Sequence, residues 1–194
     1  MDQFDEEKEH SIEMHLPYIY KILEKKIDSI KIVPVLVGSL SPSDEVLYGK
    51  LFSPYLADPS NLFVISSDFY SPGTSFNLNR KSNMPLTIPI HRSIENLDRE
   101  GMTIIERINH KEFVSYLSKT RNTICGRHPI GVLLCAIEAL PSEPEEIDVE
   151  DGTTSSAFDR IKPRIRFVHY AQSSRVTREN DSSVSYASAY VYLP

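Results

Sequence analysis

Apolar residues at helical spacing begin soon after the start of the chain. Following Ser11, which can cap a helix, hydrophobic residues recur at intervals of three and four, and Pro17 is expected to bend or delay the helix. The positions that form this pattern are Ile12, Leu16, Ile19, Leu23 and Ile27. The spacing therefore predicts a first helix over these positions.

Two short runs of apolar and β-branched residues come next, KIVPVLVG at 31–38 and NLFVISS at 61–67. Such runs are typical of strands that are buried on both faces, as in parallel or mixed sheets. Ser43 is expected to open a second helix between them. The alternation of strand and helix patterns predicts an α/β fold.

The second half of the chain predicts a loop, three helices and two strands. The stretch 70–89 is rich in Ser, Asn, Pro and Gly, which indicates a loop over one end of the sheet. Asn109 is expected to open a helix, with Glu112 at the capping-box position. The other predicted elements are a helix that ends at Gly101, an almost entirely apolar helix at 128–140, and strands at 164–174 and 182–192.

Together these elements predict a layered α/β/α fold with a mixed central sheet. Four strands are few for a sheet with two such apolar central members, because apolar strands need cover on their faces and partners on their edges. We therefore expect residues 1–194 to form a single but partial domain, whose amino-terminal strands are missing.

Composition and charge narrow this picture. The 194 residues are 40% hydrophobic, enough to bury a core, and carry a formal net charge of -6. Six acidic residues lie between positions 143 and 151 with no lysine or arginine among them, within a segment, 141–163, that has few apolar residues. We expect this segment to be a disordered, solvated insertion. No basic stripe is present, so nucleic acid is not an expected partner.

The chain also lacks the features of a membrane or secreted protein. No apolar run reaches the roughly 18 to 20 residues that span a bilayer, and the first ten residues are acidic rather than basic and apolar. Cys125 and Cys135 lie ten residues apart on a predicted helical stretch, which suits reduced thiols better than a disulfide framework. We expect a cytoplasmic protein without a membrane span.

Side chains capable of chemistry lie in two places where the predicted fold would bind a ligand. Asp68 directly follows a predicted strand, at the end where open α/β sheets bind ligands. Cys125 lies just before a helix that is predicted to start near His128, and this position, with Arg127 beside it, favours the thiolate form. A turn role for Asp68 and a core role for Cys125 are the ordinary alternatives.

Two other patterns resemble catalytic motifs only superficially. In EHSIEMH, His10 and His15 are five residues apart and would point about 140° apart on a helix, unlike the zinc motif H-E-x-x-H. The segment 169–174 and Asp181 could supply Ser, His and Asp side chains. A hydrolase is nevertheless not expected, because the chain has no G-x-S-x-G elbow.

Seven sequence blocks occur in an order that resembles the Memo family. They are EHSIEMHLPY, PVLVG, YLADPSNLFVISSDF, RSIENLD, NTICGRHPIGVLL, YAQSS and DSSVSYA. The resemblance covers nearly the whole chain apart from the loop after Phe69, the acidic insertion and the last few residues. The chain resembles the carboxy-terminal two-thirds of a Memo-family protein, and the resemblance implies a fold like that of class III extradiol dioxygenases.

The resemblance also implies a set of site residues. In the family pattern two histidines and one cysteine bind copper or iron; Cys125 matches the cysteine, and the histidines would precede this chain. Ser71 stands where the family has an acid/base histidine, and a hydroxyl cannot take up a proton near neutral pH as imidazole does. The candidate pocket residues are therefore Asp68, Ser71, Arg127 and His128, with Cys125 as the metal ligand.

For function, the resemblance implies a non-catalytic signalling protein with a vestigial metal pocket. Animal members are associated with receptor tyrosine kinases of the ErbB type, cell motility and the cytoskeleton. Protein partners are expected, including phosphotyrosine-containing receptor tails, for which Arg127 is the nearest basic candidate. We expect no cofactor in this chain, and copper or iron only in a full-length form. The alternative hypothesis is a metal-dependent dioxygenase or redox enzyme that uses Cys125.

Overall fold

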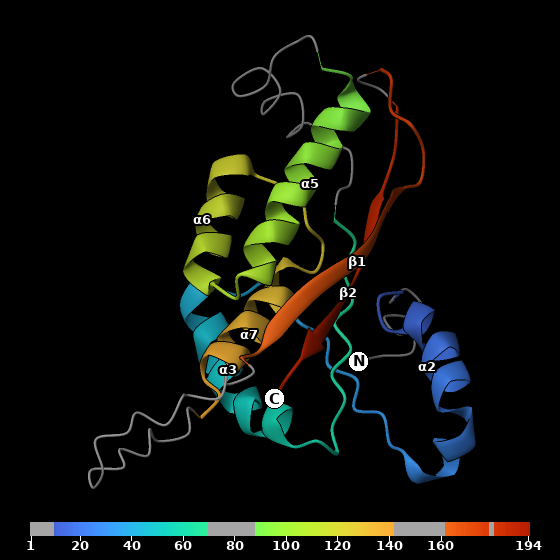
Figure 1. Ribbon diagram of the computed structural model, residues 1–194, viewed down its shortest axis with the longest axis vertical. Coiled ribbons are helices and arrows are strands. Elements are labelled where there is room, and N and C mark those ends of the chain that lie inside the picture. Colours follow the sequence, from blue (N-terminus) through green and yellow to red (C-terminus); the bar gives the residue numbers. More distant parts are fainter. Residues whose placement is uncertain (1–9, 70–87, 142–161, 179–180) are drawn as a thin grey trace, which may run out of the picture.

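The computed structural model describes residues 10–69, 88–141, 162–178 and 181–194. Ser71 and most of the predicted insertion at 141–163 lie outside the described residues. None of the described helices is long and apolar enough to cross a membrane. The elements are η1 (Glu13–His15), α2 (Leu16–Leu23), η2 (Glu24–Ser29), α3 (Pro42–Ala57), α5 (Ile90–Glu106), α6 (His110–Thr120), α7 (Arg127–Glu138), β1 (Arg164–Gln172) and β2 (Ser185–Tyr192) (Figure 1).

The helix predicted after Ser11 is confirmed, but in an interrupted form. Two 3-10 turns, η1 and η2, flank the eight-residue α2. Pro17 lies in the first turn of α2, where a missing N–H costs no helical hydrogen bond. No residue of these three elements is buried, and Ile22 is 80% exposed. The apolar face of this segment therefore adds nothing to the buried core.

The second helix begins at a different serine from the one predicted. Ser41 caps α3: its hydroxyl accepts from the Asp44 N–H at 3.2 Å, and the Asp44 carboxylate accepts from the Ser41 N–H at 3.2 Å. Pro42 then occupies the first helical position, for which its fixed φ is suited. The prediction of Ser43 is wrong by two residues, because Ser43 has the same capping chemistry but lies inside the first turn.

Helix α3 packs against α7, the apolar helix that the sequence predicted, at very short range. A Cβ atom at Gly49 would overlap the Cβ of Cys135 and lie 2.8 Å from the Cys135 carbonyl carbon. Real side chains are not accommodated at such distances, so glycine at position 49 is what permits the approach. On the α7 side, Leu134 and Cys135 are both buried.

Helix α5 is longer than predicted, and the reason concerns packing. It was expected to end at Gly101 but continues to Glu106, so this prediction is wrong. Gly101 lies against the ring of Tyr116 on α6, where a Cβ would be 3.0–3.1 Å from three ring and hydroxyl atoms. The glycine thus allows two helices to approach rather than ending one of them.

Asn109 caps α6 as predicted, and its side-chain oxygen accepts from the Glu112 N–H at 2.9 Å.

The two closing strands are confirmed as an antiparallel pair. β1 and β2 pair from Arg164 opposite Tyr192 to Gln172 opposite Ser185, with a shift in register between Phe167 and His169. Figure 1 shows this hairpin running alongside α5. The core fills the space between the helices and the hairpin, and its most deeply buried apolar members are Phe113, Ile124, Leu134 and Ala136.

The predicted strands at 31–38 and 61–67 are wrong. Among the described residues, β1 and β2 form the only sheet, and neither apolar run belongs to it. A strand is defined by its hydrogen-bonded partner, and beyond 61–67 the chain makes one backbone bond to the hairpin, from the Phe69 N–H to the Ser185 carbonyl at 2.9 Å. The mixed helix-and-strand composition is therefore confirmed, whereas the layered central sheet is not found in this part of the chain.

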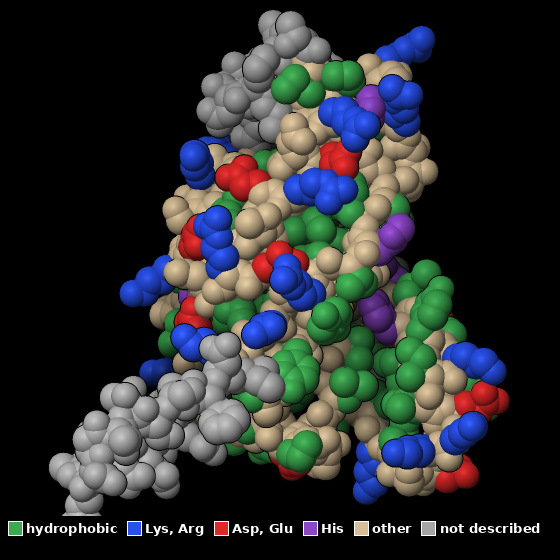
Figure 2. Space-filling view, viewed as in Figure 1, with side chains coloured by type: hydrophobic (Ala, Val, Ile, Leu, Met, Phe, Trp, Pro, Cys, Tyr) green, Lys and Arg blue, Asp and Glu red, His purple; other side chains and the backbone are tan. Residues whose placement is uncertain are grey.

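Many large hydrophobic side chains are exposed. Val33 in the run 31–38 is 81% exposed, and Leu62 in the run 61–67 is 74% exposed. Val168 on β1 of the hairpin is 64% exposed. Figure 2 shows hydrophobic side chains gathered on the side of the molecule where α2 lies. Contiguous apolar surface of this kind marks interaction sites.

Replacing Gly49 with alanine is expected to destabilise the fold, because the added methyl would overlap Cys135 on α7. Overpacking of this kind costs about 1–3 kcal/mol. Gly38 provides the control, since a Cβ there meets nothing within 4 Å. Urea denaturation should give a lower free energy of unfolding for Gly49→Ala than for Gly38→Ala. Equal stability of the two variants would contradict the close α3–α7 packing.

Candidate functional site

Two of the predicted site residues meet at the start of α7. The Cys125 N–H donates to the Asp68 carbonyl at 3.1 Å, and the neighbouring Gly126 N–H donates to the Ser67 hydroxyl at 2.9 Å. A Cβ at Gly126 would lie 2.5 Å from the Ser66 carbonyl oxygen. The end of the 61–67 run and the start of α7 are therefore held together by one backbone and one side-chain hydrogen bond, at an approach that requires glycine at 126.

The side chains at this junction have different environments. The Cys125 side chain is exposed, two residues before the first residue of α7. The Oδ1 atom of Asp68 is buried and has no hydrogen-bond partner among the described residues. Arg127 is half-buried and its Nη1 donates to the Ile124 carbonyl at 3.4 Å. Asp68 thus retains a polar atom that a ligand could use, whereas Arg127 is directed back to its own loop.

His128 belongs to a second cluster, which the sequence did not predict. The buried carboxylate of Glu45 on α3 lies between two imidazoles, 2.6 Å from His110 Nε2 and 2.7 Å from His128 Nδ1. A Cβ at Gly131 would collide with this carboxylate, so glycine leaves the space that it occupies. In addition, the His110 N–H donates to Glu138 at 2.9 Å. The cluster therefore ties α3, α6 and α7 together.

Such a cluster has a structural explanation. A buried carboxylate is stable only when its oxygens are hydrogen-bonded, and here each oxygen has its own imidazole. Sequence reasoning missed Glu45 and His110 because neither belongs to a motif. Their burial alone distinguishes them, and burial depends on the tertiary packing.

A third polar network surrounds the fully buried Asp98 of α5. Tyr170 OH donates to Asp98 Oδ2 at 2.8 Å, and the Asn122 amide donates to Oδ1 at 3.3 Å. Asn122 also donates to Tyr116 OH at 2.8 Å, and Tyr116 OH donates to the Leu97 carbonyl at 2.8 Å. The network therefore joins α5, α6, the loop before α7 and the hairpin.

Burial is the largest influence on the pKa values of the side chains in this network. Loss of hydration raises the pKa of Asp98 above its ordinary value, although hydrogen bonds from Ser185, Tyr170 and Asn122 oppose the shift. The same cause raises the pKa of Tyr116 and of Tyr170. Within this network, a neutral Asp98 is therefore favoured more strongly than in the unfolded chain.

Among the described residues, the junction offers fewer donor side chains than a metal ion needs. A closed or catalytic site uses three or more protein ligands. In the described ranges, no group of three or more His, Cys, Asp and Glu side chains could hold a metal ion. Cys125 and Asp68 are two side chains, and His128 directs Nδ1 at Glu45. The residues described at this junction do not by themselves fit a complete copper or iron site.

Comparison with known proteins decides the family. The family described as Memo-like protein matches residues 1–190. The chain belongs to this family. It is 50% identical over 182 residues to Protein MEMO1 of Homo sapiens and of Mus musculus, an alignment that covers 94% of this chain and 55% of theirs. Protein memo-1 homolog of Caenorhabditis elegans is 45% identical over 193 residues, covering 100% of this chain and 50% of its own.

The family resemblance inferred from the seven blocks is therefore confirmed. The chain spans about half the length of the curated relatives that it matches. Properties of the whole relatives consequently apply to this chain only as proposals.

The Asp98→Asn variant is expected to change how stability depends on pH. Because the folded-state pKa of Asp98 is raised, its stabilising contribution is complete below the unfolded value of about 3.9 and is lost as the pH rises through the raised pKa. Asparagine resembles the neutral carboxyl and does not titrate. The stability of the native chain relative to Asp98→Asn should therefore fall with rising pH.

Urea denaturation of both proteins between about pH 4 and pH 8 measures this difference. Taking the difference removes the contributions of carboxylates with lowered pKa values, such as Glu95 and Asp181, because both proteins contain them. A pH-independent difference would show that Asp98 titrates in the folded chain as it does in the unfolded chain.

Proposed function

We propose that this chain is a non-catalytic interaction protein of the Memo-like family that acts in receptor tyrosine kinase signalling, cell motility and the cytoskeleton. The observation that carries the proposal is 50% identity to Protein MEMO1 over 94% of the chain. Its cellular compartment is the cytoplasm, where reduced thiols such as exposed Cys125 and buried Cys135 persist.

The junction at the start of α7 supports a non-catalytic role. General acid/base catalysis needs a group of suitable pKa within hydrogen-bond reach of the reacting atom. His128, the imidazole predicted for this pocket, uses Nδ1 to bind Glu45, and Arg127 donates to a backbone carbonyl. The Nδ1 atom of His128 is thus taken up by a structural contact to Glu45 and is not directed at Asp68 or Cys125.

The exposed surface supports an interaction role. Val168, Tyr186 and Tyr190 of the hairpin are 64%, 52% and 54% exposed. Tyrosine is enriched in protein interfaces because its ring supplies apolar area and its hydroxyl supplies a hydrogen bond. The exposed face of the hairpin is therefore where we expect a protein partner to bind.

Binding to a tyrosine-phosphorylated peptide from a receptor tail tests the signalling role. We expect the phosphorylated peptide to bind this chain at least about tenfold more tightly than the same peptide without phosphate, since charge-assisted hydrogen bonds contribute about 1.5–3 kcal/mol each. Fluorescence anisotropy with labelled peptide measures both affinities. Equal affinity for the two peptides, or no binding of either, would count against the proposal.

A metal-dependent dioxygenase or redox enzyme is the second candidate, favoured by the exposed Cys125 and the orphaned Oδ1 atom of Asp68. Under the leading proposal, the purified chain contains much less than one iron or copper per molecule, and Cys125→Ala does not change this amount. Elemental analysis measures the metal content. Stoichiometric metal that is lost in Cys125→Ala would instead support the enzyme.

Cys135→Ala is the matched control for the metal measurement. Burial raises the pKa of the Cys135 thiol to about 12, so this thiol stays protonated and is a poor metal ligand. Loss of metal in both cysteine variants would indicate a general effect on folding rather than ligation by Cys125.

A further inference from the structure

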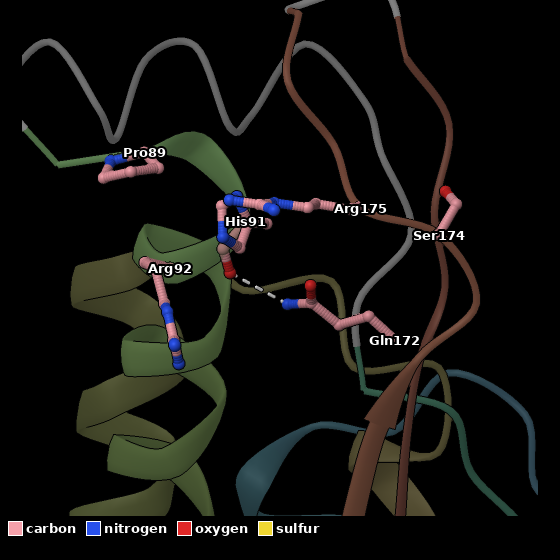
Figure 3. Close-up of a pocket in the computed structure, with 6 residues that line it drawn as sticks. All are labelled: Pro89, His91, Arg92, Gln172, Ser174 and Arg175. Atoms are coloured by element: carbon pink, nitrogen blue, oxygen red, sulfur yellow. Dashed lines mark hydrogen bonds between the residues drawn. The ribbon is translucent and has the colours of Figure 1, made fainter.

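A hollow of about 470 Å³ lies where α5 begins, between that helix and the end of the hairpin (Figure 3). Three of its lining residues are basic and none is acidic. The lining residues are Pro89, His91, Arg92, Gln172, Ser174 and Arg175. The hollow is therefore a candidate site for an anion.

Two of the basic side chains lack partners in the part of the chain that the structure describes. The Nδ1 atom of His91 is buried there without a hydrogen bond. Arg175 is exposed, and no hydrogen bond or ion pair to its guanidinium is found among the described residues. Figure 3 shows Arg175 reaching from the hairpin towards His91 at the start of α5. The arginine is thus a donor without an acceptor, and the imidazole Nδ1 beside it can donate as well in the tautomer that carries its proton there.

The backbone at the start of α5 also favours a negatively charged ligand. Pro89 precedes the helix and supplies no side-chain cap, and its carbonyl accepts from the N–H groups of Arg92 and Ser93 at 3.0 Å each. The N–H groups of Ile90 and His91 remain without a backbone acceptor among the described residues. Such groups, together with the dipole of a 17-residue helix, favour an anion at this end.

The neutral lining residues position the donors rather than compete with them. Gln172 Nε2 donates to the His91 carbonyl at 2.9 Å and to Tyr170 OH at 2.9 Å, which holds the first turn of α5 against β1. The Ser174 hydroxyl donates to the Ser182 carbonyl at 2.6 Å. Arg92 is partly neutralised by Glu95, 2.8 Å away. Arg175 and His91 are therefore the side chains available to a ligand.

We propose that this hollow binds the phosphate of a phosphate monoester, with Arg175, His91 Nδ1 and the start of α5 as its donors. A dianionic phosphate offers enough acceptor oxygens for the arginine fork, the imidazole and a backbone N–H at once. The site adds a binding residue set to the proposed signalling function. It rests on that function for the molecule that carries the phosphate, which we take to be a phosphorylated protein side chain. It replaces Arg127, whose guanidinium donates to Ile124, as the centre of phosphate recognition.

Titration of the full chain with phenyl phosphate, followed by NMR of the ¹⁵N-labelled protein, tests the site. We expect saturable shifts at Ile90 and His91, and affinity reduced at least about tenfold in Arg175→Gln, since a charge-assisted bond contributes about 1.5–3 kcal/mol. Arg166→Gln is the matched control: Arg166 lies on β1, is exposed and is not part of the hollow, so the same loss of charge should change affinity less than about twofold. Equal weakening in both variants, or no saturable shifts, would overturn the proposal.

Two further ligands identify the chemistry. Benzoate carries the same ring with one negative charge, and binding as tight as that of phenyl phosphate would overturn the assignment to phosphate. Inorganic phosphate is expected to bind in a manner that depends on Arg175, because the phosphate group itself is recognised. Inorganic phosphate that binds Arg175→Gln as well as the native chain would count against the site.

The phosphopeptide experiment separates this proposal from the proposed function. Peptide binding that persists in Arg175→Gln would leave the signalling role intact and overturn the hollow as its phosphate site. Phenyl phosphate binding that requires Arg175, without any phosphopeptide binding to the native chain, would support the phosphate site. It would contradict the assignment of a phosphorylated protein as the ligand.

Discussion

The carboxylate of Glu45 is the interaction on which the arrangement of the helices depends most. It lies between His110 and His128, so one buried residue of α3 fixes both α6 and α7. Removing a partner from a buried carboxylate costs the desolvation energy of that group, so the three helices cannot shift independently. The start of α7 is fixed in consequence, and with it the contact between Cys125 and the carbonyl of Asp68.

Local patterns predicted the elements that depend on local chemistry. The cap at Asn109, the apolar α7 and the two closing strands all follow from spacing and side-chain type within a few residues. The prediction of strands at 31–38 and 61–67 was wrong because an apolar run shows that burial is favoured but does not supply a strand partner. The prediction that a helix ends at Gly101 was wrong for a related reason. The role of this glycine is set by its contact with Tyr116, fifteen residues away on another helix.

The same distinction explains which site residues were found. Asp68 and Cys125 were each singled out by their position at the end of a predicted element, and only the family resemblance grouped them in one site, where the Cys125 N–H contacts the Asp68 carbonyl. Glu45 and Asp98 carry no local signal: each is one acidic residue in a helix, and only the folded chain shows that it is buried and shared among several elements. His91 and Arg175 are far apart in sequence and are brought to one hollow by the pairing of α5 with β1.

The hollow and the Asp98 network are parts of one hydrogen-bonded chain. Gln172 joins the His91 carbonyl to Tyr170 OH, and Tyr170 OH donates in turn to Asp98. Because these side chains link the first turn of α5 to the hairpin, the backbone positions of His91 and Arg175 are set before any ligand arrives. A site whose backbone is held in this way loses less conformational entropy on binding than a flexible loop would, so the cost of ordering falls mainly on the exposed Arg175 side chain. The buried carboxyl of α5 thus acts at a distance, as a support for the walls of the hollow.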